Sequence, residues 1–88
     1  MVKLDPQLQP IVDQMKAILD NLNKMLKILR DGGGSANDLL AMVRRHEAML
    51  REGRASILET RGEAYAALVD PLIERVVECR REVETHVQ

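Results

Sequence analysis

Aromatic residues are almost absent from this chain. Its 88 residues include no tryptophan and no phenylalanine, and Tyr65 is the one tyrosine. Aromatic side chains usually anchor ligand pockets, and they provide the stacking platforms on which proteins bind single-stranded nucleic acid. Their scarcity argues against both kinds of binding site.

An excess of charge, a pair of cysteines and long apolar runs are also missing. The 13 basic and 14 acidic residues leave a net charge of −1, so nothing in the charge balance favours nucleic acid. Cys79 is the one cysteine, which cannot form an internal disulfide and fits a reducing compartment. The first residues lack the apolar run of a signal peptide, and no stretch approaches the roughly 18 apolar residues of a transmembrane helix. We therefore expect a protein of the cytoplasm or another reducing compartment.

What the chain does have is aliphatic and charged residues in helical order. Hydrophobic residues make up 45 % of the sequence and charged residues 31 %, which is too apolar for a disordered segment. The apolar residues recur every three or four positions, which is the period of an amphipathic helix. The fold class we predict is all-α, a small coiled-coil-like helical bundle of about three helices.

The first predicted helix covers residues 6–30. Asp5 and Pro6 form a helix-start signal, because Asp accepts hydrogen bonds from free amides of the first turn and Pro has no amide to leave unpaired. Pro10 allows the regular part to begin as late as Gln9. The apolar face consists of Leu8, Ile11, Met15, Ile18, Leu22, Met25 and Leu29, with Val12, Leu19 and Leu26 at neighbouring positions.

The second predicted helix covers residues 37–69. Ser35 is a candidate N-cap, and Asp38 completes a loose capping box. Gly53 and Gly62 are weak points, and a break at Gly53 with a new helix soon after is the alternative. Good helix formers and an apolar register that continues through the gap favour one helix. Its apolar residues are Leu39, Met42, Val43, Met49, Leu50, Ile57 and Leu68, with His46 in the same stripe.

Asp70 and Pro71 repeat the start signal and predict a last helix over residues 71–86. Proline inside a helix removes a backbone hydrogen bond and clashes with the preceding turn, at about 3 kcal/mol, so we expect a break or kink near 70–71. The sequence leaves open whether the chain kinks there into a bent rod or reverses into a hairpin. The apolar face of this helix includes Leu72, Val76 and Val83.

The basic residues change type at the glycine run of residues 32–34. All four lysines precede it, and every arginine except Arg30 follows it. Both residue types serve a solvated helix face, so no structural demand explains the separation. Gly-Gly-Gly-Ser is also the composition of a flexible linker, which raises the effective concentration of two modules that bind each other. We interpret the chain as an engineered fusion of an amphipathic segment (1–31), a flexible linker (32–35) and a helical domain (36–88); a natural glycine-rich loop is the alternative.

The function predicted from these patterns is a non-enzymatic protein–protein interaction. Helix 6–30 would pack in an apolar groove formed by helices 37–69 and 71–86, as a ligand helix does in helix-in-groove binding. No residue pattern suggests catalysis, a cofactor or a metal site, and Asp13 and Asp20 on the polar face argue against membrane binding. The predicted interface residues are Leu8, Ile11, Met15, Ile18, Leu22, Met25, Leu29, Leu39, Val43, His46, Leu50, Ile57, Leu68, Leu72, Val76 and Val83.

Two alternatives come from other classes of protein. One is a natural coiled-coil domain that forms homo-oligomers, since three aliphatic stripes in 88 residues are more than one small bundle easily covers. The other is a small metal- or haem-binding helical protein that uses His46 and His86. For His46 the simpler interpretation is a half-solvated residue at the edge of a helix interface. The anchors expected to matter most are Ile11, Ile18, Leu22, Met25 and Leu29.

Overall fold

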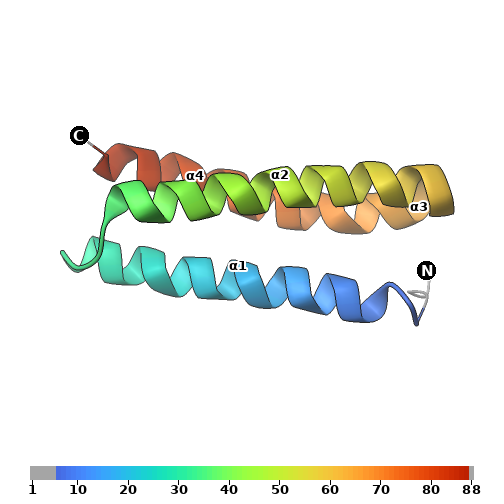
Figure 1. Ribbon diagram of the computed structural model, residues 1–88, viewed down its shortest axis with the longest axis horizontal. Coiled ribbons are helices and arrows are strands. Elements are labelled where there is room, and N and C mark those ends of the chain that lie inside the picture. The colour runs from blue at the N-terminus through green and yellow to red at the C-terminus, as the bar shows by residue number, and fades with distance from the viewer. Residues whose placement is uncertain (1–5, 88) are drawn as a thin grey trace.

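The computed structural model describes residues 6–87 and shows three long helices packed side by side in an antiparallel bundle (Figure 1). The bundle is a rod of 42 × 18 × 18 Å. The described residues form helices and no strands, which confirms the predicted all-α bundle of three helices. In chain order the elements are helix α1 (Gln9–Arg30), helix α2 (Ala36–Arg61), the short helix α3 (Glu63–Ala66), the 3-10 turn η1 (Ala67–Val69) and helix α4 (Asp70–His86).

Helix α1 packs against both α2 and α4 through a single seam of residues spaced three or four apart. This spacing follows one line along the helix, so the seam fills the space between two neighbouring helices. The predicted anchors Ile11 and Met25 are not part of it, because they are 47 % and 39 % exposed. Each comes one position before a seam residue, on an edge of α1 that neither neighbour covers. The seam consists of Leu8, Val12, Met15, Leu19, Leu22 and Leu26.

The first helix starts slightly later than the predicted residue 6. It begins at Gln9, and Pro10 lies in its first turn, where a missing amide hydrogen costs no helical hydrogen bond. Leu8 occupies the N-cap position and has no side chain that could accept a hydrogen bond. Asp5, one half of the predicted start signal, lies outside the described residues.

The glycine run between α1 and α2 forms an ordered turn. Gly32 has a φ of +92°, and the amides of Gly32 and Gly33 donate hydrogen bonds to the carbonyl oxygens of Leu29 and Ile28, at 3.0 and 2.9 Å. These two bonds are those of a Schellman motif, which satisfies free carbonyl groups at a helix end and needs a residue that tolerates positive φ. The local hydrogen bonding therefore gives this glycine a specific structural role at the end of α1.

Helix α2 begins as predicted. The hydroxyl oxygen of Ser35 accepts a hydrogen bond of 3.3 Å from the amide of Asp38, so Ser35 is the N-cap. The helix then continues through Gly53 without a break. Gly53, one of the two predicted weak points, therefore does not interrupt the helix.

The predicted helix over 37–69 is wrong at its C-terminal end. α2 ends at Arg61, and Gly62 adopts φ +92° and ψ 175°, a backbone region essentially restricted to glycine. The chain therefore reverses at Gly62 and not at Pro71, which lies in the first turn of α4. A break was predicted near residues 70–71. There the chain only changes from the 3-10 turn η1 to the α-helix α4, without a reversal.

The early reversal also changes which residues face the core. The stripe that contains Leu50 and Ile57 stops at the reversal, so the helical register starts again beyond Gly62. Leu68, predicted on the buried stripe, is 36 % exposed, whereas Ala66 and Val69 are fully buried.

The burial of the α1 seam makes a direct prediction about stability. Leu19→Ala is expected to lower the free energy of unfolding by about 2–5 kcal/mol, since it removes a fully buried side chain and leaves a cavity. Leu58→Ala is the matched control, because the same change at a leucine 40 % exposed should alter stability by only about 0.5 kcal/mol. Urea denaturation at one protein concentration measures both. Equal effects of the two substitutions would contradict the placement of the seam.

The backbone of Gly62 makes a second prediction. Gly62→Ala should lower the free energy of unfolding by about 1–3 kcal/mol, because its φ of +92° is strained for any residue with a Cβ. Gly53→Ala is the control: Gly53 is helical, and an added Cβ there would meet only the flexible Cε of Met15, at 3.0 Å. That substitution should be neutral or stabilise by up to about 1 kcal/mol, the helix propensity of alanine over glycine. If Gly62→Ala left the free energy of unfolding unchanged, the chain would not reverse at Gly62.

Candidate interaction surface

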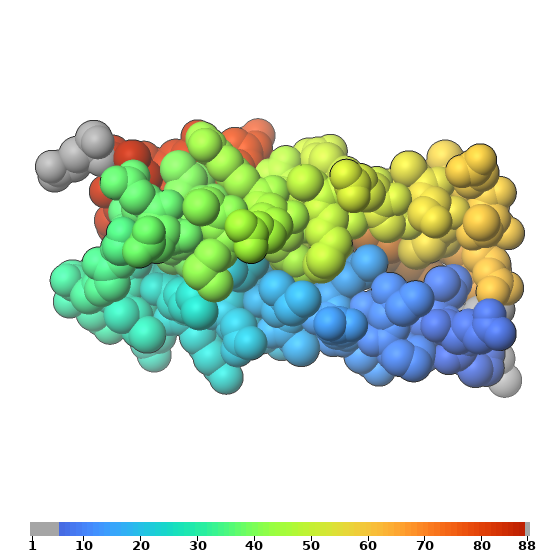
Figure 2. Space-filling model, viewed as in Figure 1, coloured from blue at the N-terminus to red at the C-terminus, as the bar shows by residue number. Residues whose placement is uncertain are grey.

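Exposed apolar side chains gather on the face formed by α1 and α2. On this face four residues, two from each helix, are 39–47 % exposed, and Ile28 is 55 % exposed. Figure 2 views the molecule from this side, with α1 (blue to cyan) next to α2 (green to yellow). Together with the partly buried Ile18 they form what we call the apolar strip: Ile11, Ile18, Met25, Ile28, Met42 and Met49.

The strip is continuous because of its residue spacing. Ile11, Ile18 and Met25 are seven residues apart on α1, and Met42 and Met49 are seven apart on α2. Seven residues are close to two helical turns, so each set forms a line along its helix. The two helices are antiparallel neighbours, so the two lines run side by side.

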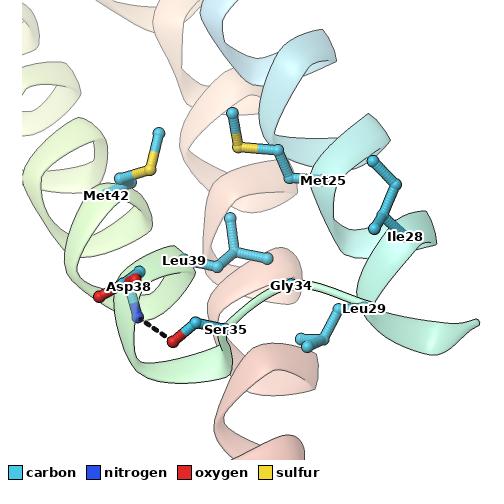
Figure 3. A pocket seen from close by; sticks show the side chains of 8 residues that line it. All are labelled: Met25, Ile28, Leu29, Gly34, Ser35, Asp38, Leu39 and Met42. Carbon is cyan, nitrogen blue, oxygen red and sulfur yellow. Dashed lines mark hydrogen bonds between the residues drawn. The ribbon is translucent and has the colours of Figure 1, made fainter. Parts of the chain in front are cut away.

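One hollow in the strip lies near the glycine turn. It has a volume of about 200 Å³, and it is lined by Met25 of α1, by Met42 and Leu39 of α2, and by the turn itself. Figure 3 shows the two methionines projecting from the two helices on the same side, above the turn that Ser35 closes. Methionine side chains are flexible and polarisable, so such a hollow can adapt to different apolar side chains.

A second hollow, of about 380 Å³, lies further along the same two helices. Its lining includes Ile11 and Met15 from α1 and Met49 from α2. Gly53 contributes no side chain at this point, so the surface between the helices stays open. The strip is therefore a shallow groove in which apolar side chains alternate with open space.

The ion pairs that join the three long helices lie on the other side of the bundle. In each of these ion pairs one partner belongs to α4, and none of the pairs joins α1 to α2. Glu47 is central: burial alone would raise its pKa, but hydrogen bonds from Arg80 and Arg51 outweigh burial and hold the pKa below its ordinary value. The pairs are Arg30–Glu82, Asp20–Arg75 (3.3 Å), Glu47–Arg80 (2.7 Å) and Arg54–Asp70 (2.6 Å).

The rim of the strip carries charges on α2 and amides on α1. Arg45 and Glu52 flank Met49 on the outer side of α2, both are exposed, and neither is in an ion pair with a described residue. The corresponding positions of α1 are occupied by Gln14 and Asn21, which are also exposed. The groove thus has an apolar floor and a polar rim, as protein-binding surfaces do.

His46 lies on the core side of α2 and is 3 % exposed, so the predicted half-solvated edge position is wrong. Neither ring nitrogen has a hydrogen-bond partner within residues 6–87. Burial lowers the pKa of His46, because a charged imidazolium would lose its hydration there; the main-chain carbonyl of Met15 opposes this shift less strongly. The folded bundle therefore holds this histidine in its neutral form at neutral pH.

Most of the predicted interface residues lie inside the bundle and hold its helices together. Of the five anchors only Leu22 is fully in the core; Ile18 and Leu29 are partly buried. The strip residues Ile28, Met42 and Met49 were missing from the predicted interface residues, although Met42 and Met49 were among the predicted apolar residues of the second helix. The buried predicted residues are Leu8, Met15, Leu22, Leu39, Val43, His46, Leu50, Ile57, Leu72, Val76 and Val83.

The histidines do not form a ligand set in this structure. His46 is in the core, whereas His86 is exposed in the last turn of α4. Within the described part of the chain, no group of three or more His, Cys, Asp or Glu side chains is placed to hold a metal ion. None of the described helices is both long and apolar enough to cross a membrane. Comparisons with protein-family models, with curated proteins and with solved structures find no match to this chain.

The buried, unpaired His46 predicts a pH dependence of stability. An ordinary histidine in the unfolded chain gains a proton below about pH 6.5, while His46 in the folded chain resists protonation until lower pH. Stability should therefore be complete above pH 6.5 and fall as the pH drops below it. Urea denaturation between pH 5 and 8, with about half-unit steps, would measure this slope.

His46→Leu should remove most of that slope and match or exceed the stability of the original chain at pH 5.5. His86→Gln is the control, because it removes an exposed histidine and should leave the slope intact. The ion pairs of Glu47 and Glu82 lower the pKa of both carboxyl groups, which moves their titration away from the pH range measured. A slope that survives His46→Leu would refute this assignment.

Proposed function

We propose that this chain is a non-enzymatic protein–protein interaction module that binds its partner along the apolar strip. The observation that carries the proposal is the exposure of Ile11, Met25, Ile28, Met42 and Met49 on one face. Scattered apolar side chains on a surface need no explanation, but a continuous strip over two helices is typical of an interaction site.

The shape of the groove favours an amphipathic helix as the ligand. The helices satisfy their own backbone hydrogen bonds, so the face offers no strand edge to an extended peptide. The hollows are shallow and open, unlike the concave sites that enclose small molecules. A helix with apolar residues at heptad positions would match the seven-residue repeat of Ile11, Ile18 and Met25.

This proposal moves the binding surface from the one the sequence predicted. Helix α1 does lie along α2 and α4, but the residues between them form the core of one bundle. That packing is what a ligand helix in a groove would show, and also what a natural three-helix domain would show. The engineered origin of the chain stays a prediction.

A labelled helical peptide tests the proposal. The probe is a fluorescent amphipathic peptide of about five turns with leucine at heptad a and d positions, titrated with the full chain and followed by anisotropy. We expect saturable binding, and a loss of at least about tenfold in affinity for Met42→Glu, which places a charge in the strip. Leu58→Glu is the control, because Leu58 is similarly exposed, at 40 %, outside the strip.

Two results would contradict the proposal. One is the absence of saturable binding to the original chain. The other is an equal loss of affinity for Met42→Glu and Leu58→Glu, which would mean that the peptide responds to overall charge and not to the strip.

A further inference from the structure

We infer that the strip is covered by a second copy of this chain, packed antiparallel about a two-fold axis at the level of Ile18 and Met49. This inference rests on the proposed function, since it names the partner of the same surface. Three features of the strip carry it: its symmetry along the rod, the charges on its rim and its size.

The first feature is that the α1 row of the strip is symmetric about Ile18. On α1, Ile11 and Met25 lie seven residues on either side of Ile18. On α2, Met49 lies at the centre of the helix Ala36–Arg61. Met25 shares a hollow with Met42, and the second hollow, which Ile11 lines, extends from Met49 to Ser56 on α2. Ile18 lies between the two hollows on α1, which puts it near the level of Met49. A single two-fold axis across the rod therefore places α1 on α1 and α2 on α2 of the second copy over their full lengths.

The second feature is the self-complementary charge of the rim. Arg45 comes four residues before Met49 and Glu52 three residues after it. A two-fold axis at Met49 places Arg45 of each copy opposite Glu52 of the other, twice per dimer. Since neither side chain is in an ion pair with a described residue, both are available for this contact.

The rim of α1 follows the same rule with uncharged groups. Gln14 comes four residues before Ile18 and Asn21 three residues after it, so the axis brings these two amides together. Amides can donate and accept hydrogen bonds in this position. A two-fold axis along the rod would instead place α1 of each copy on α2 of the other, and Arg45 and Glu52 would then face the uncharged rim of α1, without this charge complementarity.

The third feature is size. The rod measures 42 Å by 18 Å along a long face, an area on the order of 750 Å². A stable interface of standard size covers about 800 Å² on each partner, so a long face of this rod is nearly sufficient. The pairing would bring together four helices, two from each copy, and cover the apolar strip on the face that Figure 2 views.

Charge exchange between the copies tests this arrangement. Sedimentation equilibrium of the full chain should show a dimer. Arg45→Glu and Glu52→Arg alone should each weaken the dimer by roughly tenfold, because each puts like charges opposite one another at two contacts. The double variant should recover the original dimerisation constant. An equimolar mixture of the two single variants should form a mixed dimer, in which both contacts again join opposite charges.

Two further variants separate the strip from the rest of the surface. Met49→Glu should abolish the dimer, since it puts two charges on the axis. Arg44→Glu is the control. Arg44 is exposed and directly precedes Arg45 in the sequence, but it is not part of the rim, so reversing its charge should leave the dimer unchanged. A dimer that survives Met49→Glu, or a charge exchange without recovery, would overturn the inference.

The remaining outcomes distinguish this inference from the proposed function. A chain that stays monomeric but binds the helical peptide through Met42 would overturn the self-pairing and leave the interaction module intact. A monomeric chain that binds no peptide would overturn both. A monomer that binds only vesicles of anionic phospholipid would also overturn both, since it would assign the strip to a membrane surface.

Discussion

The organisation of this molecule depends on a mismatch between the apolar surface of α1 and the surface that two neighbouring helices can cover. The apolar arc of α1 is wider than one seam, because residues such as Ile11 and Val12 are both apolar. A helix in a three-helix bundle buries one seam between its two neighbours. The row with Val12, Leu19 and Leu26 enters that seam, and the row with Ile11 and Met25 is left outside. The exposed strip is therefore a direct result of how the core packs.

The position of the charges reinforces this division. The interhelical ion pairs connect α4 to α1 and α2, so the two grooves beside α4 have charged or polar cover. The groove between α1 and α2 has an apolar floor, and no described ion pair crosses it. Exposed ion pairs contribute little to stability, but they do fix which side of a bundle is hydrated. One long face of the rod is consequently the most apolar, and the other two carry the ion pairs between the long helices.

The two chain reversals rely on glycine in the same physical way. Gly32 and Gly62 both adopt a φ of +92°, which side chains with a Cβ rarely accept, and each comes directly after a helix. Gly53, in contrast, is helical and leaves space for Met15. The same residue type therefore ends a helix at Gly32 and Gly62 but continues one at Gly53. The packing around each glycine decides which of the two occurs.

The sequence by itself determined the fold class, the cap at Ser35 and most of the core. These features depend on local hydrogen bonding and on apolar periodicity, which can be read from neighbouring residues. It could not determine that the chain reverses at Gly62, because the continuing apolar stripe of α2 and the break signal at Pro71 both pointed elsewhere.

It also could not determine which of two adjacent apolar rows on α1 is buried. Both rows have the same periodicity, and only the positions of α2 and α4 decide between Leu19 and Ile18. The tertiary structure made that choice, because the seam between α2 and α4 has room for only one of these two rows, and the row left outside became part of the candidate interaction surface.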